Sequence, residues 1–427
     1  MRKYFHTYRK FFAVALVFVA TAVSAPVQAE NNITGTIVRS SDESGQESPY
    51  YLVPYGFYTD SMGTVAGIAG GISGRPQEQS RLFATVLASD LGAKAGYVFF
   101  NDYRTPWSDR LFIDARLGIG DFPKLRGYFD IGTPSVPPAG SNDSLPDNYI
   151  ETNGYTDWAE LNIKYVLAAG SAKTSPLNVY TLNNGLLAGG ASGGEIWNPF
   201  VSGRTTVGAR FFYFDRYYDT AGGTRYTTTG INLNFDYDNT DFPINPAKGS
   251  KLYLSLKHDP GLSGNTGPWT NTEVKFSKYF DLPTDARTDQ RVVALNFWTA
   301  NTLSTNMAPP NYGINLGGLY RMRAYPIERF YDRAAIYYSA EFRAIPRSDL
   351  LRNIRMLSFL KLQWWEVVAF YERGRVAPSW DLGLLHTDMK QDVGVGIRTM
   401  INKNIGRMDL AYSDEDWSIL FMVGHPF

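Results

Sequence analysis

The chain has 427 residues, with 41 basic side chains, 41 acidic side chains and no cysteine. A balanced charge gives no electrostatic case for binding nucleic acid. The absence of cysteine excludes disulfides, thiolate metal sites and a lipid anchor on an N-terminal cysteine. Aromatic residues make up 15% of the chain and glycine occupies 40 positions, a mixture typical of alternating strands joined by tight turns.

The N-terminus has the pattern of a secretory signal peptide. Four basic residues lie within 2–10, Phe11 to Ala20 is an unbroken apolar run, and Ala29 offers a small-residue cleavage site before Glu30. The apolar run is shorter than the roughly 20 residues that a membrane-spanning helix needs. We expect export with removal of residues 1–29. The mature chain then has 37 basic and 41 acidic side chains, a net charge of −4.

Apolar and polar side chains alternate with a period of two along the remaining chain. In segment 231–238, four apolar side chains alternate with asparagine and aspartate, and segment 158–167 repeats the pattern. Many such segments of about ten residues, an aromatic excess and an export signal together favour a transmembrane β-barrel over a soluble sandwich. The sixteen predicted strands are 50–58, 63–73, 80–90, 92–103, 110–119, 155–168, 203–217, 225–238, 249–259, 268–281, 289–303, 333–345, 362–373, 390–401, 405–413 and 417–427.

The even number of strands places both ends of the barrel domain, residues 49–427, on the periplasmic side. Parity then makes the turns at 239–248, 282–288 and 402–404 periplasmic. It makes the long connections 120–154 and 304–332 external. Segment 169–202, rich in glycine and serine, is either a long periplasmic connection or contains an extra hairpin.

The last predicted strand ends on an aromatic residue, Phe427, which we interpret as a barrel-assembly signal. Gly424 and Pro426 weaken this strand, because proline cannot donate to a ladder and glycine lowers strand stability. We therefore expect a short, weak seam between this strand and the strand at 50–58.

Several motifs then occur in a fixed order, and together they resemble the BamA/TamA family of outer-membrane barrels. Residues 317–325 read GGLYRMRAY, and Arg323 and Tyr325 match the family's V-R-G-[F/Y] loop signature, with alanine at 324 in place of glycine. The following strand carries Glu341-Phe342-Arg343, similar to the family's E-[Y/F]-R. The other similar motifs are 236–249 (DYDNTDFPINPAKG), 370–374 (FYERG), 394–398 (GVGIR), 407–409 (RMD) and 424–427 (GHPF).

The resemblance implies a sixteen-stranded antiparallel barrel with an external loop folded into its lumen. It implies that Arg323 engages the carboxylates of Glu341 and Glu372 on the inner wall, in the bidentate geometry that guanidinium favours. The family usually carries periplasmic POTRA domains. Because residues 30–48 form only a short N-terminal segment, the resemblance implies a barrel-only member without them.

The aspartate-rich segment from Asp236 through Pro246 to Gly249 has two readings. The carboxylates could hold a cation, but a polar turn in which they bond their own backbone is favoured. Segment 190–194 matches G-x-S-x-G without the strand-turn-helix context that a nucleophile elbow needs. We expect no enzyme activity and no cofactor or metal.

The favoured function is assistance of protein or lipid insertion or transport in the outer membrane, through the weak seam. The alternatives are a passive channel and a structural barrel that dimerises or anchors a partner. Expected partners are outer-membrane lipid and lipopolysaccharide, together with a second copy or a separately encoded periplasmic protein.

Overall fold

The computed structural model describes residues 38–42, 50–59, 62–130, 135–263, 267–310, 312–348, 350–351, 362–401 and 404–427. The proposed signal peptide, residues 1–29, and most of the predicted segment 30–48 lie outside these residues. Within the described part of the chain, no helix has the length and apolar character needed to cross a membrane.

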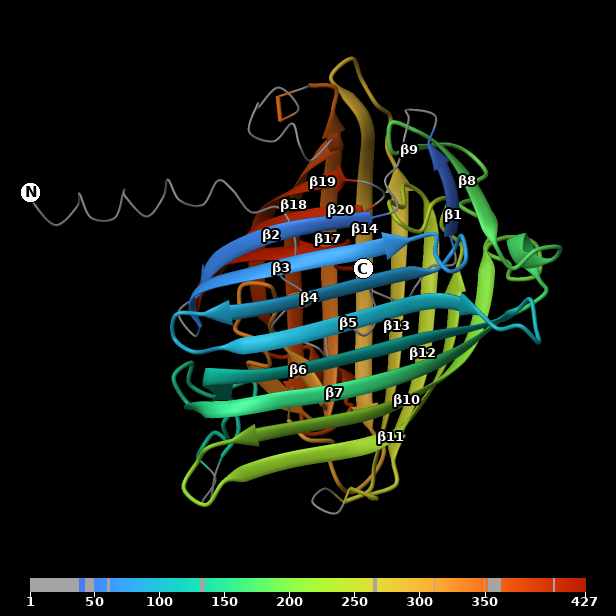
Figure 1. Ribbon diagram of the computed structural model, residues 1–427. Coiled ribbons are helices and arrows are strands. Elements are labelled where there is room, and N and C mark those ends of the chain that lie inside the picture. The colour runs from blue at the N-terminus through green and yellow to red at the C-terminus, as the bar shows by residue number, and fades with distance from the viewer. Residues whose placement is uncertain are drawn as a thin grey trace, which may run out of the picture.

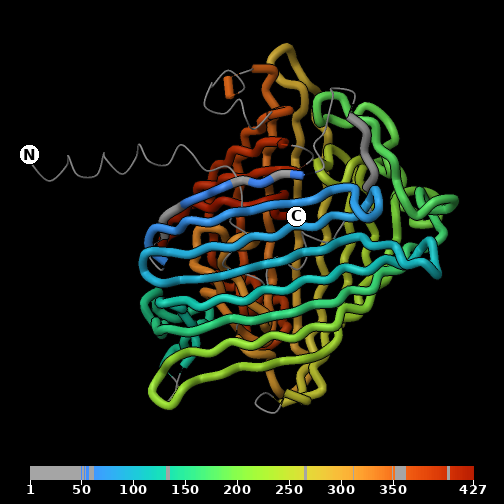
Figure 2. Tube along the Cα trace, viewed as in Figure 1, coloured from blue at the N-terminus to red at the C-terminus, as the bar shows by residue number. Residues whose placement is uncertain are grey.

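Sixteen strands form one antiparallel sheet in which neighbours follow the order of the chain (Figures 1 and 2). The predicted sixteen-stranded antiparallel architecture is therefore confirmed. Ladders between described residues run from β2 to β21, which are the two ends of the order. The strands of this sheet are β2 (Tyr50–Thr59), β3 (Gly63–Ser73), β4 (Arg81–Ser89), β5 (Lys94–Arg104), β6 (Leu111–Gly127), β7 (Ile150–Val166), β10 (Arg204–Tyr218), β11 (Thr224–Asp238), β12 (Gly249–Asp259), β13 (Trp269–Asp281), β14 (Thr288–Thr302), β17 (Ala334–Pro346), β18 (Leu362–Ala377), β19 (Lys390–Ile401), β20 (Asn404–Ser413) and β21 (Trp417–Val423).

In the described part of the chain, seven shorter elements lie outside this sheet. They comprise two small sheets and two single helical turns. The elements are β1 (Val38–Asp42), η2 (Gly170–Ala172), β8 (Asn178–Asn183), β9 (Leu186–Gly189), β15 (Ile314–Leu316), β16 (Phe330–Asp332) and α1 (Leu382–Leu385).

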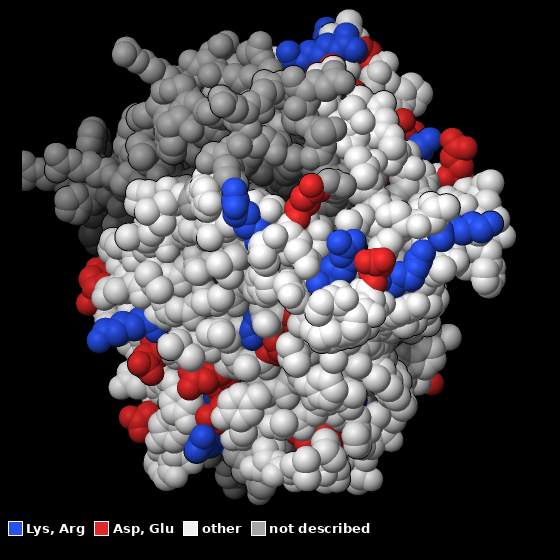
Figure 3. All heavy atoms as spheres, turned by 45° about the vertical axis from the view of Figure 1, so that its right-hand side comes forward, with Lys and Arg blue, Asp and Glu red and all other residues white. Residues whose placement is uncertain are grey.

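The period-two alternation divides each strand between an outer apolar face and an inner polar face. On β12, Leu254 and Leu256 are exposed on the outside, whereas Ser255 and Lys257 are buried inside. Most of the face visible in Figure 3 is correspondingly free of charge. An apolar outer wall and a polar, filled interior are the arrangement of a membrane barrel.

Strands β6 and β7 are longer than predicted, so the external connection between them is 128–149 rather than 120–154. The ladder continues beyond the apolar alternation because polar cross-strand pairs support it. Arg126 lies opposite Glu151, and their side chains form an ion pair with Nε and Oε2 2.7 Å apart. Sequence periodicity does not detect such an extension, because apolar and polar side chains no longer alternate along it.

Segment 169–202 contains the extra hairpin that the sequence left open. Strands β8 and β9 form it, and β1 pairs in parallel with β8 (Figure 1). Tyr180 and Leu182 of β8 are fully buried against Trp364 and Met400, which face the barrel interior at the end that the sequence predicts to be periplasmic. The indole of Trp364 donates to the carbonyl of Gly185 at 3.2 Å. The hairpin therefore closes part of the periplasmic mouth.

The last strand ends earlier than predicted. β21 stops at Val423 because Gly424 adopts a φ of +85°, a backbone conformation that favours glycine. Residues 424–427 then turn away from the sheet. The prediction of a strand through Phe427 is wrong for these four residues.

Candidate functional site

The external connection between β14 and β17 is folded into the barrel; it is called loop 6 below and comprises residues 303–333. Its short strands β15 and β16 pair with each other. Met322, Ala324 and Tyr325 are buried among inward-facing wall residues such as Val368. Gly317 at the start of the motif has φ +105°, and a Cβ there would lie 2.3 Å from the carbonyl oxygen of Pro326. Glycine is therefore required at this bend.

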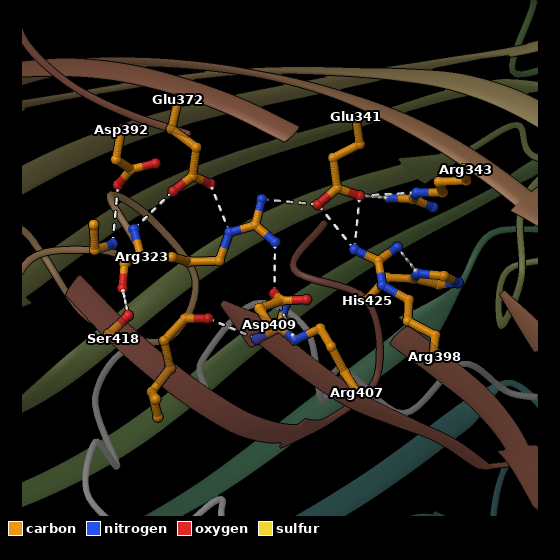
Figure 4. A network of polar contacts seen from close by, with 12 residues as sticks. Arg323, Glu341, Arg343, Glu372, Asp392, Arg398, Arg407, Asp409, Ser418 and His425 are labelled. Atoms are coloured by element: carbon orange, nitrogen blue, oxygen red, sulfur yellow. Dashed lines mark hydrogen bonds and ion pairs between the residues drawn. The ribbon is translucent and has the colours of Figure 1, made fainter. Parts of the chain in front are cut away.

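Arg323 lies at the centre of a buried charge cluster on the inner wall (Figure 4). Its Nε donates to Glu372 Oε1 at 3.0 Å, and its backbone N–H donates to Glu372 Oε2 at 2.7 Å. Its Nη1 donates to Asp409 Oδ2 at 2.7 Å, and its Nη2 lies 2.9 Å from Glu341 Oε1. All four side chains have no exposed surface. One guanidinium thus bridges carboxylates from β17, β18 and β20.

The ring of Phe370 supports the same guanidinium from one side. The Arg323 Cζ atom lies 3.5 Å from the centroid of this ring. Stacking of this kind suits the planar, weakly hydrated guanidinium and not a lysine ammonium. The site therefore selects arginine by shape as well as by charge.

Glu341 is a second hub of the cluster. Its two oxygens each accept from Arg398 Nη2 at 2.9 Å, and Oε2 accepts from Arg343 Nε at 2.8 Å. Around Arg323 the cluster contains three arginines and five carboxyl groups of the wall, so Arg323 brings the formal charge of the cluster closer to neutral. These wall residues are Arg343, Arg398, Arg407, Glu341, Glu366, Glu372, Asp392 and Asp409.

The residues flanking Arg323 add hydrogen bonds to the wall. Ala324 N donates to Asp392 Oδ2 at 3.1 Å, so the alanine that replaces the family glycine fits the contact. The positive φ in this stretch falls on Met322 instead. Tyr325 Oη donates to the carbonyl of Gln391 at 3.0 Å, and Ser418 Oγ of β21 donates to the carbonyl of Arg323 at 2.5 Å. Loop 6 is thereby tied to the closing strand.

A second arginine fixes the outer part of loop 6. Arg329 Nε donates to Glu415 Oε2 at 2.8 Å, and its Nη2 donates to the carbonyl of Ser144 at 2.7 Å. Ser144 belongs to the external connection 128–149. This connection therefore packs on loop 6 from the outside.

The predicted turn residues do not join this cluster. Asp236 belongs to β11, Pro246 is buried in the following turn, and Gly249 opens β12 with φ +105°. In the turn, Asp241 Oδ1 accepts from the backbone N–H groups of Phe242, Ala247 and Lys248 at 2.9–3.2 Å. The carboxylate bonds its own turn, as the favoured reading stated. Nowhere in the described ranges do three or more His, Cys, Asp or Glu side chains gather to hold a metal.

The C-terminal tail lies near the cluster instead of on the barrel wall. His425 Nδ1 lies 2.6 Å from Arg398 Nη1, and its Nε2 lies 3.2 Å from Asn245 Oδ1. The Phe427 ring is stacked on Tyr279 at 6.3 Å and lies 5.2 Å from the Arg343 Cζ atom. Pro426 is buried with them. Gly424 redirects the chain, and the side chains that follow fill the periplasmic end of the lumen.

Asp409, Arg398 and Asp392 belong to the cluster but were not among the predicted partners of Arg323. The alternation on β19 and β20 places all three on the same inner face as Glu341. Comparison of the inward-facing positions on neighbouring strands could have identified these three residues from the sequence.

The fold and the lumenal loop define an outer-membrane β-barrel. Residues 204–413, from β10 to β20, match the model of the Omp85 superfamily domain. No curated protein sequence matches the chain.

Three solved structures are similar to this chain at low sequence identity. CdiB from Escherichia coli matches with a TM-score of 0.54 and 11% identity, over 89% of this chain and 63% of that one. CdiB from Acinetobacter baumannii matches with a TM-score of 0.46 and 12% identity, over 88% and 59%. BamA from Haemophilus ducreyi lacking POTRA domains 1–3 matches with a TM-score of 0.47 and 10% identity, over 88% and 70%. The chain thus spans less than two thirds of either CdiB.

Proposed function

We propose that this barrel assists insertion or translocation of proteins or lipids in the outer membrane through a seam between β2 and β21. The observation that carries the proposal is the short closing strand. β21 has seven residues, whereas β10 and β11 have fifteen each. A ladder to β21 can form few hydrogen bonds, each with a net value of about 0.5–1.5 kcal/mol. Separation at this edge is therefore less costly than between longer strands such as β10 and β11.

Loop 6 supports the closing strand from inside. Leu319 and Tyr320 pack against Met422 of β21, and Ser418 donates to the loop backbone. The charge cluster holds the loop on the wall, and the loop holds β21. The position of Arg323 therefore couples the wall to the seam.

The filled lumen favours a route along the wall over an open channel. Loop 6 occupies the external part, while the β8–β9 hairpin and the C-terminal tail occupy the periplasmic part. The link of the Omp85 superfamily with protein insertion and translocation supports the same choice. A second copy or a separately encoded periplasmic protein as partner remains a prediction from the sequence.

A reversible disulfide across the seam tests the proposal, and the natural absence of cysteine makes the background clean. Cysteines are placed in β2, for example at Leu52, and in β21 at Ile419 or Phe421. The purified variant is reconstituted in liposomes with an unfolded eight-stranded barrel as the probe. Folding of the probe is read from its heat-dependent mobility on gels.

Oxidation is expected to abolish insertion of the probe, and reduction to restore it. The control pair is Val98 and Leu117, which lie opposite each other in the β5–β6 ladder. This pair should form a disulfide and leave insertion unchanged. Full activity with the seam locked would refute the proposal.

A further inference from the structure

The segment just before β10 exposes apolar side chains on the outside of the protein. We call residues 195–202 the aromatic turn. Phe200 is 80% exposed, Val201 58%, Ile196 55% and Trp197 46%. Contiguous exposed apolar side chains of this kind mark an interaction surface.

The aromatic turn lies against the outer wall of the barrel. The Trp197 ring lies 4.6 Å from the ring of Tyr237 and 5.8 Å from that of Phe276. Both belong to outward rows, which on β11 include the exposed Leu233 and on β13 the exposed Phe280. Tyr237 is itself buried because the turn covers it. The apolar face of the turn is thus continuous with the lipid-facing wall.

The turn lies at the periplasmic edge of that wall. Tyr237 is the penultimate residue of β11, directly before the turn at 239–248. On β13, Lys278 shares the outward face, and its Nζ lies 5.5 Å from the Phe280 ring centroid. Aromatic rings beside a lysine that can extend toward water are typical of the membrane–water interface.

Hydrogen bonds within the turn and from β11 and its following residues pair several of its backbone groups. The carbonyl of Asn198 accepts from the N–H groups of Val201 and Ser202, both at 3.0 Å. The carbonyl of Ile196 accepts from Asn239 Nδ2 at 3.0 Å, and that of Ser202 accepts from Tyr237 Oη at 3.0 Å. The N–H of Phe200 donates to the Asn198 side chain at 3.0 Å. A segment that enters hydrocarbon must pair its polar backbone groups in this way.

A charged pair lies at the N-terminal end of the aromatic turn. Glu195 is exposed and its Oε1 lies 3.1 Å from Lys248 Nζ. This ion pair lies at the start of the turn, and the apolar side chains follow it. The arrangement resembles that of an interfacial segment, with a polar side toward headgroups and an apolar side toward acyl chains.

We propose that the aromatic turn inserts into the inner leaflet of the outer membrane and binds the acyl chains of its phospholipids. Phe200 and Val201 enter the acyl region, Trp197 lies at the interface, and Glu195 stays at headgroup level. The inference is independent of the seam and depends only on the placement of the barrel in the outer membrane. The aromatic turn would be a lipid-binding segment beside β11–β13. These strands are separated from β2 and β21 by several others in the order of the sheet.

Single cysteines carrying an environment-sensitive fluorophore test the proposal in the full chain. Phe200→Cys is the test position, Glu195→Cys marks the polar border, and Leu145→Cys in the external connection 128–149 is the exposed control. Heat-dependent mobility on gels verifies that each variant is folded. The labelled proteins are reconstituted in phosphatidylcholine vesicles that contain lipids with nitroxide groups on their acyl chains, and iodide is the aqueous quencher.

The label at 200 is expected to lose most of its emission to the nitroxide lipid and little to iodide. The label at 145 should show the opposite, and the label at 195 an intermediate response. Quenching of the label at 200 by iodide to the same extent as at 145 would overturn the proposal. Protection from both quenchers would also overturn it, because a protein surface would then cover the turn.

Discussion

Arg323→Ala tests whether the lumenal cluster holds loop 6 on the wall. The substitution removes contacts to three buried carboxylates on three strands. Glu341 keeps its ion pairs with Arg343 and Arg398, whereas Glu372 loses its ion pair with Arg323. Removal of one partner from a buried ion pair costs about 3–5 kcal/mol. We expect a loss of this size in the free energy of unfolding.

The matched control is Arg347→Ala. Arg347 Nε lies 2.8 Å from Asp289 Oδ1, but both side chains are about half exposed. An exposed pair contributes about 0–1 kcal/mol because water and salt screen it. Arg347→Ala therefore removes one exposed ion pair, whereas Arg323→Ala removes three buried ones.

Urea unfolding of the detergent-solubilised variants, followed by tryptophan fluorescence, provides the measurement. Arg323→Lys keeps the charge but cannot fork onto several carboxylates, so it should fall between the wild type and Arg323→Ala. Protease cleavage within loop 6 should increase in the same order. If Arg323→Ala is no less stable than Arg347→Ala, the cluster does not hold the loop and the reasoning is wrong.

Three further predictions concern the periplasmic side. Gly424→Ala should lower the free energy of unfolding by about 1–2 kcal/mol, because residue 424 has a φ of +85°. The cost comes from the backbone conformation, since no atom lies within 4 Å of the added Cβ. Gly189→Ala, at a glycine without positive φ, is the control in the same urea assay. The backbone N–H of Arg287 and the Arg291 side chain hold the pKa of Asp285 below its ordinary 3.8. The stability difference between wild type and Asp285→Asn should persist above pH 3.8 and vanish as pH falls through the lowered pKa; constancy in acid would contradict this sign. Replacement of 178–189 by a glycine-serine linker should raise single-channel conductance, and unchanged conductance would show that the hairpin does not obstruct the mouth.

The strand count could be predicted because lipid and lumen impose opposite polarities on alternate residues. In β11, for example, Leu233 faces lipid and Asn232 faces the lumen. Strand ends above the membrane, as at Arg126 and Glu151, carry no such contrast, so their extent was missed. The placement of 169–202 depends on contacts with Trp364 and Met400, which are far away in the sequence.

Part of the lumenal site could be predicted from the sequence. The motif around Arg323 and the alternation around Glu341 and Glu372 pointed to the inner wall. The inward turn of the tail was not predicted, because a strand pattern continues up to Val423 and one residue, Gly424, changes its direction. The interactions of Phe427 with Tyr279 and Arg343 are tertiary contacts that period-two alternation does not encode.

The central proposal is that the barrel opens at the β2–β21 seam. The most direct measurement is a spin-label distance between Leu52→Cys and Ile419→Cys in lipid bilayers, with the pair Val98→Cys and Leu117→Cys as the reference for an intact ladder. We predict more than one distance population at the seam, with the longer one increased by Arg323→Ala. A single narrow distance like that of the reference, unchanged by Arg323→Ala, would contradict the proposal.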